Sequence, residues 1–192
     1  MIFKIAAIVV LALFYGIYFS KMFLQKRQGI QTRQLRKRKE RGIYLVETVM
    51  SAATLSVVPV QLVSVILDWS WLPSSARFTG FLLGMLGDLF FLISVIAMKN
   101  SWRVGIPEDA KTELVTEGIY CFSRNPAFVG FDFMYIGVCL LFCNPLTLFF
   151  SVFSMVMLHL QILQEETYLE QTFGDSYVQY KRTVFRYLGR RR

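Results

Sequence analysis

Five long apolar blocks limit this chain to a helical membrane fold. Each comes close to the roughly 20 residues that an α-helix needs to cross the hydrocarbon core of a bilayer. In chain order the blocks are Met1–Leu24, Ile43–Leu67, Phe78–Met98, Pro126–Cys143 and Leu146–Leu163. Inside lipid, a helix satisfies its own backbone hydrogen bonds. We therefore expect an all-α integral membrane protein with about five transmembrane helices. It should form a single membrane domain over residues 1–192, with three spans in 1–98 and the remainder in 99–192.

The last two blocks are short and are separated only by Asn144 and Pro145. Asn is a favoured N-cap, and Pro is favoured at the first helical position. The two blocks should therefore form a tight helical hairpin. The same pair of residue types at Asn125 and Pro126 predicts that the fourth helix begins at Pro126. The polar segment Tyr168–Leu188, with aromatic residues at helical spacing, predicts a C-terminal helix on the cytoplasmic side.

The positive charge is concentrated in alternate connections. Lys26–Arg41 holds eight cations, Lys99–Arg124 four and Lys181–Arg192 six, whereas Asp68–Arg77 holds only Arg77. With five spans, the basic regions fall on one side, which the positive-inside rule places in the cytoplasm. We therefore expect the N-terminus outside and the C-terminus inside, in a multi-pass protein of a bacterial cytoplasmic membrane with its active site facing the cytoplasm. Membrane lipid, rather than nucleic acid, is the expected partner of these cations.

The basic connection Gln25–Arg41 allows two structures. Ile30 and Leu35 are scattered among its cations, as in a short helix lying on the membrane surface. A solvated basic loop fits the same residues equally well. The sequence leaves this choice open.

The cysteines and the lone histidine do not form a metal-ligand pattern. Cys121 lies in a predicted loop, Cys139 and Cys143 are four residues apart on one helix, and His159 lies in the last block. This spacing matches neither a zinc site nor a disulfide framework. We expect no metal, and no obligate protein partner is evident.

Glycine and aspartate residues mark positions inside the predicted bundle. Gly80, Gly84 and Gly87 lie on nearly one face of the third span, which is a signature of close helix packing. Asp88 lies beside that face, and Asp132 lies two turns into the fourth helix. A carboxyl group inside a membrane is expected to face the bundle or a polar cavity. Structural pairing and a functional role both stay open for Asp88.

The segment Leu114–Phe128 links the two apolar halves and ends in a candidate anion site. A helix that begins at Pro126 directs its free N–H groups and positive dipole end toward Arg124 and the preceding loop. Glu165 and Glu166 lie at the cytoplasmic end of the last block, close to where Arg124 should emerge. The alternative is that Asn-Pro only starts a helix.

Taken together, these motifs resemble the isoprenylcysteine carboxyl methyltransferase family, and phospholipid N-methyltransferases share part of the pattern. The matching residues are Leu114, Val115, Thr116, Gly118, Tyr120, Arg124, Asn125, Pro126, Phe128, Gly130, Cys143, Asn144, Pro145, Glu165, Glu166, Leu169, Phe173, Gly174, Tyr177 and Tyr180. The resemblance extends over roughly Trp102–Tyr187. It rests on the order and spacing of several motifs, each of which is weak alone.

The resemblance implies a membrane methyltransferase that uses S-adenosylmethionine. Its acceptor would be lipophilic, either an isoprenylcysteine carboxylate or another lipid or small molecule that enters from the bilayer. Arg124 and Glu165 would be catalytic, and Gln161 would contact the substrate. The implied cofactor-binding residues are Thr112, Leu114, Val115, Tyr120, Asn125, Pro126, Phe128, Glu165 and Glu166.

Two positions depart from the family pattern. Asn125 stands where relatives usually have His, and Gln161 stands where prenylcysteine-specific relatives carry Arg. Because a neutral amide binds a carboxylate more weakly than a guanidinium does, Gln161 argues against prenylcysteine as the acceptor. In the competing account, Arg103 or Arg124 already serves the carboxylate.

Two functions of other classes fit the same residues. One is a non-catalytic binding or assembly protein on this fold, and the other is a nicotinamide-dependent membrane reductase. Binding of S-adenosylhomocysteine, of NADPH, or of neither would separate them from a methyltransferase.

Overall fold

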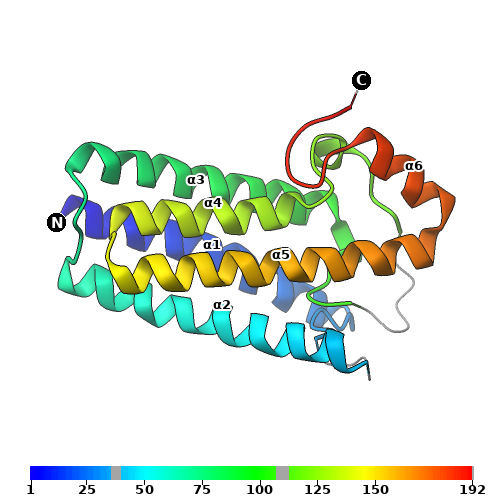
Figure 1. Ribbon diagram of the computed structural model, residues 1–192, viewed down its shortest axis with the longest axis horizontal. Helices are drawn as coiled ribbons and strands as arrows, with labels where there is room; N and C mark the ends of the chain where they lie inside the picture. Colours follow the sequence, from blue (N-terminus) through cyan, green and yellow to red (C-terminus); the bar gives the residue numbers. More distant parts are fainter. Residues whose placement is uncertain (36–39, 107–112, 192) are drawn as a thin grey trace.

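The computed structural model describes residues 1–35, 40–106 and 113–191, and these fold into a bundle of α-helices (Figure 1). In the described ranges the only extended pairings are two isolated β-bridges. The α-helices are α1 (Ile2–Arg27), α2 (Arg41–Leu67), α3 (Ser74–Ala97), α4 (Pro126–Leu141), α5 (Pro145–Phe173) and α6 (Asp175–Thr183). Short 3-10 turns occur at η1 (Lys99–Ser101) and η2 (Gly118–Cys121). The all-α prediction is confirmed.

Four of these helices, α1, α2, α3 and α5, are long and apolar enough to cross a membrane. The predicted fourth span is the shorter apolar helix α4, with 16 residues. The fifth span is longer than predicted, because α5 continues without a break to Phe173. Glu165 and Glu166 therefore lie on α5 itself, where a rigid helix sets their directions.

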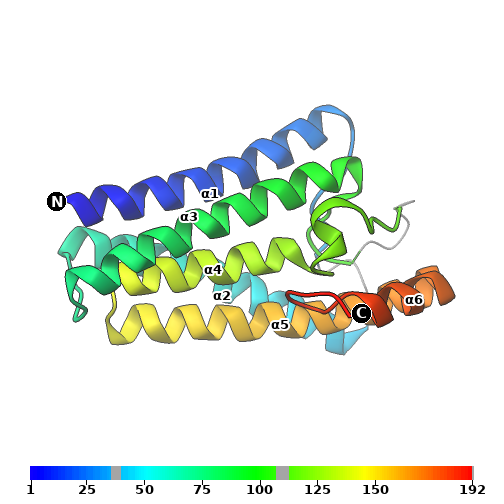
Figure 2. The same ribbon diagram turned by 90° about the horizontal axis from the view of Figure 1, so that it is seen from above.

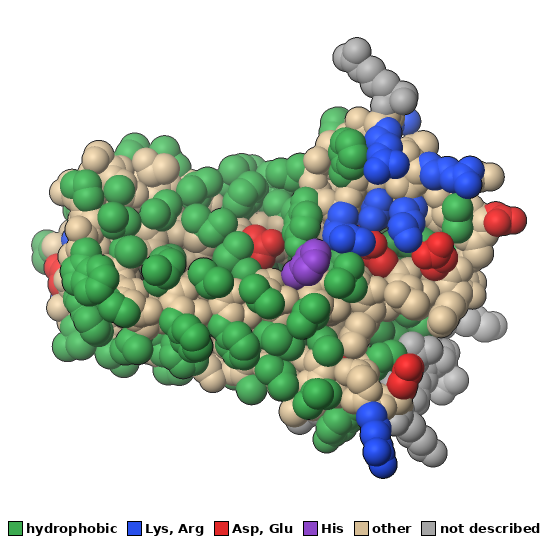
Figure 3. All heavy atoms as spheres, viewed as in Figure 1, with side chains coloured by type: hydrophobic (Ala, Val, Ile, Leu, Met, Phe, Trp, Pro, Cys, Tyr) green, Lys and Arg blue, Asp and Glu red, His purple; other side chains and the backbone are tan. Residues whose placement is uncertain are grey.

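The long helices run side by side along the molecule, and their connections gather at its two ends (Figures 1 and 2). One end holds the N-terminus, the α2–α3 turn and the α4–α5 turn. The other holds the start of α2, the start of α4, helix α6 and the C-terminus. On the face drawn in Figure 3, most Lys and Arg side chains gather at this second end, while apolar side chains cover the length of the helices. The direction in which the bundle crosses the membrane stays a prediction.

Helices α3 and α4 pack at backbone contact through glycine. A Cβ atom built on Gly87 would lie 2.6 Å from the backbone nitrogen of Met134, and one on Gly80 would lie 2.6 Å from the carbonyl oxygen of Gly137. A Cβ atom on Gly84 would meet the side chain of Val10 on α1, while the Gly84 backbone lies against Gly137 of α4, so that one glycine face serves both α4 and α1. The predicted small-residue packing surface is confirmed.

Both Asn-Pro pairs start helices, but only one Asn side chain caps its helix. Asn144 Oδ1 accepts hydrogen bonds from the backbone N–H groups of Leu146 and Thr147, at 3.1 and 3.0 Å. Its amide donates to Ser64 Oγ at 2.9 Å, which ties the hairpin turn to α2. Asn125 occupies the N-cap position of α4 without a side-chain cap bond. Its side chain is used elsewhere, in the candidate site.

Candidate functional site

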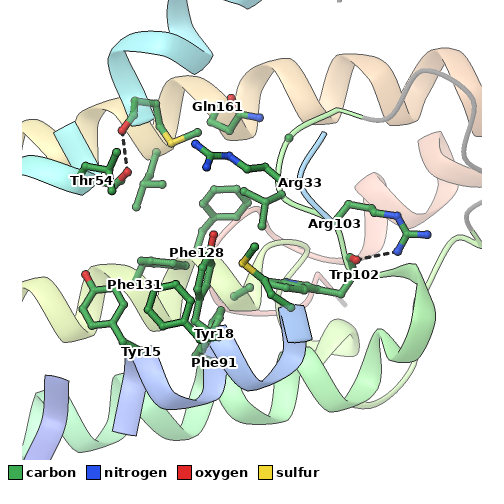
Figure 4. Close-up of a pocket in the computed structure, with 18 of the residues that line it drawn as sticks. Tyr15, Tyr18, Arg33, Thr54, Phe91, Trp102, Arg103, Phe128, Phe131 and Gln161 are labelled. Atoms are coloured by element: carbon green, nitrogen blue, oxygen red, sulfur yellow. Dashed lines mark hydrogen bonds between the residues drawn. The ribbon is translucent and has the colours of Figure 1, made fainter. Parts of the chain in front are cut away.

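A cavity of about 590 Å³ lies between α1, α2, α4 and α5 (Figure 4). Its body is apolar and strongly aromatic, with Phe91, Phe128 and Phe131 among the lining residues. The aromatic rings contact one another, as in the edge-to-face pair of Phe91 and Phe131 with centroids 5.3 Å apart. Such rings give the cavity stiff walls. A cavity of this size and lining fits a small apolar ligand.

The cavity reaches the outer surface between α1 and α2. Phe19 on α1 and Leu55 on α2 both line it, yet they are 61% and 68% exposed. Residues that line a cavity and are also exposed mark its opening. Because these two residues lie within apolar helices of membrane-spanning length, we expect this opening to face the hydrocarbon of the bilayer.

One end of the cavity is polar. Gln161 and Glu165 lie one turn apart on α5, and Gln161 Nε2 donates to Glu165 Oε1 at 3.1 Å. Gln161 is 1% exposed, and its Oε1 has no hydrogen-bond partner in the described residues. Arg33 and Arg103 also line the cavity, and the Arg103 guanidinium is turned away from it (Figure 4). The cavity thus joins an apolar body to a small set of charged and amide groups.

The start of α4 borders the same cavity. Ala127 and Phe128, the second and third residues of the helix, line it. The first intrahelical bond of α4 is donated by Val129, to the Asn125 carbonyl at 3.1 Å. The N–H groups of Ala127 and Phe128 precede this bond, so they are left for another partner. The predicted helix start is confirmed, and its dipole end lies beside the cavity.

Glu166 is the centre of a second polar group, on another side of α5. Its Oε1 accepts from Arg124 Nη2 at 2.6 Å and from Asn125 Nδ2 at 3.2 Å, and its Oε2 accepts from Arg186 Nη2 at 2.9 Å. Arg124 Nη1 also donates to the Val184 carbonyl at 2.7 Å. The hydrogen bonds to Glu166 raise the pKa of Arg186 above its ordinary value. This cluster holds residues 184–191, here called the C-terminal arm, against the start of α4.

Two further predicted cofactor residues, Leu114 and Tyr120, lie in or beside an aromatic cluster next to that arm. Leu114 packs on Tyr177, Tyr180 and Val184. Tyr180 Oη donates to the Tyr120 carbonyl at 2.7 Å, which fixes η2 on α6. Burial raises the pKa of both the Tyr120 and the Tyr180 hydroxyl, so both stay neutral.

The structure separates the predicted site residues into three groups. Gln161, Glu165 and Phe128 line the cavity, with Pro126 starting the adjacent helix. Arg124 and Asn125 bind Glu166, so that Arg124 is not a hydrogen-bond partner of Glu165. The third group, Leu114 and Tyr120, lies in or beside the aromatic cluster.

Some residues fall outside these groups. Val115 is partly buried next to Leu114, and Thr112 lies outside the described residues. Sequence reasoning missed Arg33 and Arg186, which it treated only as members of basic runs.

Part of this chain is similar to a known protein family. The family model of the isoprenylcysteine carboxyl methyltransferase (ICMT) family matches residues 80–171. The match begins within α3 and ends two residues before the end of α5, and so it contains the start of α4 and both Glu165 and Glu166. Helices α1 and α2, which form the other wall of the cavity, lie outside it.

Individual relatives match over a similar region. Protein-S-isoprenylcysteine O-methyltransferase B of Arabidopsis thaliana is 32% identical over 103 residues, covering 52% of this chain and 52% of the relative. The protein-S-isoprenylcysteine O-methyltransferase of Schizosaccharomyces pombe is 43% identical over 72 residues, covering 37% and 30%. The Saccharomyces cerevisiae protein of that name is 33% identical over 108 residues, covering 55% and 45%. The matches thus span about half, or less, of the length of these relatives.

Proposed function

This chain belongs, through residues 80–171, to the isoprenylcysteine carboxyl methyltransferase family, and from this premise we propose that it is a membrane methyltransferase. It transfers a methyl group from S-adenosylmethionine to a lipophilic acceptor in the cavity between α1, α2, α4 and α5. One observation supports this most strongly. The polar end of a lipid-facing apolar cavity is built largely by residues of the matched segment.

An isoprenylcysteine is the acceptor class that fits best. Relatives are named for that substrate. In this chain, the apolar body of the cavity suits an isoprenoid chain, and the opening between Phe19 and Leu55 admits it from the bilayer. The carboxyl end of the molecule would then meet the polar end of the cavity. A lipidated protein would present the same chemical group at its C-terminal cysteine.

The polar end also fits the amino-acid part of S-adenosylmethionine. Glu165 has only an amide partner among the described residues, and it would bind the cofactor ammonium through charge-assisted hydrogen bonds. The unpartnered Oε1 of Gln161 would accept another of its protons. The N–H groups at the start of α4 would bind the cofactor carboxylate. When bound, the cofactor supplies an electrophilic methyl group.

The contribution of the protein is positioning rather than acid–base chemistry. Methyl transfer needs the attacking oxygen in line with the methyl group and water excluded. The aromatic walls hold the acceptor and keep the reacting end dry. The Glu166 cluster acts indirectly, because it fixes the start of α4 through Arg124 and Asn125.

Two measurements on purified protein in detergent test this proposal. S-adenosylhomocysteine should bind in the micromolar range by titration calorimetry, and NADPH should not bind. Labelled methyl groups should then pass from S-adenosylmethionine to N-acetyl-S-farnesylcysteine or to a lipid extract. Tight NADPH binding would indicate a reductase, and binding of neither nucleotide a non-catalytic protein.

A further inference from the structure

We propose that Arg33 binds the anionic group of the acceptor and so determines which acceptors this protein takes. The inference rests on the proposed function, because it names the residue that recognises the acceptor in the same cavity. Arg33 lies in the connection between α1 and α2, outside the family match. Figure 4 shows its side chain reaching into the cavity from that connection, toward Gln161 on α5.

The backbone of Arg33 is held firmly in place. The N–H of Gln34 donates to the Val104 carbonyl at 2.8 Å, and the N–H of Val104 donates to the Thr32 carbonyl at 3.0 Å. These bonds form an isolated parallel bridge between Arg33 and Val104. Buried Gln25 links the two segments: its Oε1 accepts from Thr32 Oγ1 at 2.7 Å, and its Nε2 donates to the Trp102 carbonyl at 3.0 Å.

Close packing supports the same bridge. A Cβ atom at Gly105 would lie 2.8 Å from the backbone nitrogen of Leu35, so the two segments meet without room for a side chain there. These contacts fix the backbone, whereas the exposed Arg33 side chain keeps its rotamer freedom until it binds a partner. The backbone of Arg33 is therefore held at the rim of the cavity.

Arg33 has no counterion in the part of the chain that the structure describes. The ion pairs there join Arg77 to Asp68, Arg124 and Arg186 to Glu166, and Lys181 to Glu170. The carboxylate of the cavity lining, Glu165, is bonded to Gln161. A guanidinium without a partner among the described residues, at the exposed rim of a mostly apolar cavity, is complementary to an anion carried by an apolar molecule.

The other candidate arginines make hydrogen bonds within the protein, although Arg103 Nε is buried without a partner among the described residues. Arg124 binds Glu166 and the Val184 carbonyl. Arg103 donates to the carbonyls of Asn100 and Trp102, and Figure 4 shows its guanidinium turned away from the cavity. Arg33 therefore supplies the guanidinium that position 161 lacks, and it does so from a different element of the fold.

The anion belongs to the acceptor rather than to the cofactor. Arg33 lies in the wall formed by the first two helices and their connection, together with the aromatic residues Tyr18 and Phe19. The groups suited to the cofactor, Glu165 and the start of α4, come from the matched segment. A carboxylate at Arg33 would have its apolar chain directly in the aromatic body of the cavity.

The test measures binding selectivity, independently of turnover. Affinities for N-acetyl-S-farnesylcysteine and for its carboxamide are compared in wild type, Arg33→Ala and Arg33→Lys. We expect wild type to prefer the carboxylate by roughly tenfold or more, as for a hydrogen-bonded ion pair. Arg33→Ala should bind both ligands equally, and Arg33→Lys should recover part of the preference because Lys keeps the charge. The affinity for S-adenosylhomocysteine should stay the same in all three.

Arg27→Ala is the matched control. Arg27 belongs to the same basic region but stacks on the Phe23 ring and does not line the cavity, so this variant should keep the wild-type preference. The proposal is overturned if wild type does not prefer the carboxylate, if Arg33→Ala keeps the preference, or if Arg33→Ala loses affinity for S-adenosylhomocysteine instead. Carboxylate preference without any methyl transfer would refute the proposed function and leave the role of Arg33 standing.

Discussion

At the scale of single residues, the adjacent Glu165 and Glu166 do different work because a helix turns about 100° per residue. Glu165 faces the cavity and Gln161, while Glu166 faces Arg124, Asn125 and Arg186. A Glu-Glu pair at a helix end can therefore serve two sites at once. The sequence indicates the pair, but it does not indicate which member faces which site.

We expect Glu165→Gln to weaken binding of S-adenosylhomocysteine without unfolding the protein. A hydrogen bond to a charged group contributes about 1.5–3 kcal/mol, so affinity should fall roughly tenfold or more. The amide still pairs with Gln161, so the melting temperature should stay near that of wild type. Titration calorimetry in detergent measures the first effect and thermal unfolding the second. Unchanged affinity would place the cofactor ammonium elsewhere.

Glu166→Gln should instead lower the stability of the folded protein. The side chains of Glu166 and Arg124 are only 5% and 7% exposed, so removing the charge leaves a buried cation without its partner. We expect the free energy of unfolding to fall by about 1.5–3 kcal/mol. Proteolysis of the C-terminal arm should also become faster.

Glu170→Gln is the control for Glu166→Gln. The side chains of Glu170 and Lys181 are 44% and 39% exposed, and exposed ion pairs of that kind contribute about 0–1 kcal/mol to stability. Equal destabilisation by the two substitutions would show that the Glu166 cluster is no stronger than a surface ion pair.

Sequence reasoning identified the residues of the site more successfully than it predicted which of them contact one another. The start of α4 at Pro126 follows from Asn-Pro chemistry, and it is observed. Which of the two glutamates pairs with Arg124 does not follow, because it depends on which side of α5 faces the start of α4. Nor does the position of Arg33, since the bridge to Val104 joins segments that are far apart in the sequence.

At the scale of elements, the α3–α4 contact is the one most sensitive to added side-chain volume. A Cβ atom at Gly137 would lie 2.6 Å from the Gly84 Cα atom and 2.7 Å from the Gly80 carbonyl oxygen. Both are backbone atoms, so the helices themselves would have to separate.

Gly137→Ala should therefore destabilise the protein by about 1–3 kcal/mol, the cost of overpacking a close contact. Gly16→Ala is the matched control, because a Cβ atom on that residue of α1 meets nothing within 4 Å. It should leave stability unchanged or raise it by up to about 1 kcal/mol through helix propensity. Thermal unfolding in detergent compares them. A Gly137→Ala protein as stable as Gly16→Ala would refute the close packing.

The helices were more predictable than the connections. Apolar length, Asn-Pro pairs and spaced glycines all act locally, so they indicate where helices lie and which faces pack. In the described part of the connection after α1, residues 30–35 are not helical, and Gln31 and Arg33 are exposed while Thr32 and Gln34 are buried. Its structure depends on a tertiary partner, the segment around Val104, which local patterns do not reveal.

At the scale of the whole molecule, the orientation in the membrane is the main untested prediction. The second end of the bundle carries the basic connections, so we expect it to be cytoplasmic. In a background with the three native cysteines replaced by Ser, a cysteine at exposed Arg190 should react only after cells are permeabilised. A cysteine at exposed Ser74 should react in intact cells. Labelling of position 190 from outside would invert the topology.

The short length of α4 sets the depth of the site. Its 16 residues rise about 24 Å, less than the hydrocarbon thickness of about 30 Å. Since α4 ends at the hairpin turn, we expect, on the predicted topology, that its N-terminus at Pro126 and the polar end of the cavity lie below the cytoplasmic surface. We then expect that the proposed acceptor, entering between α1 and α2, never leaves the bilayer. Its effective concentration would be its mole fraction in the lipid, so adding inert lipid at constant total acceptor should slow the proposed reaction by surface dilution.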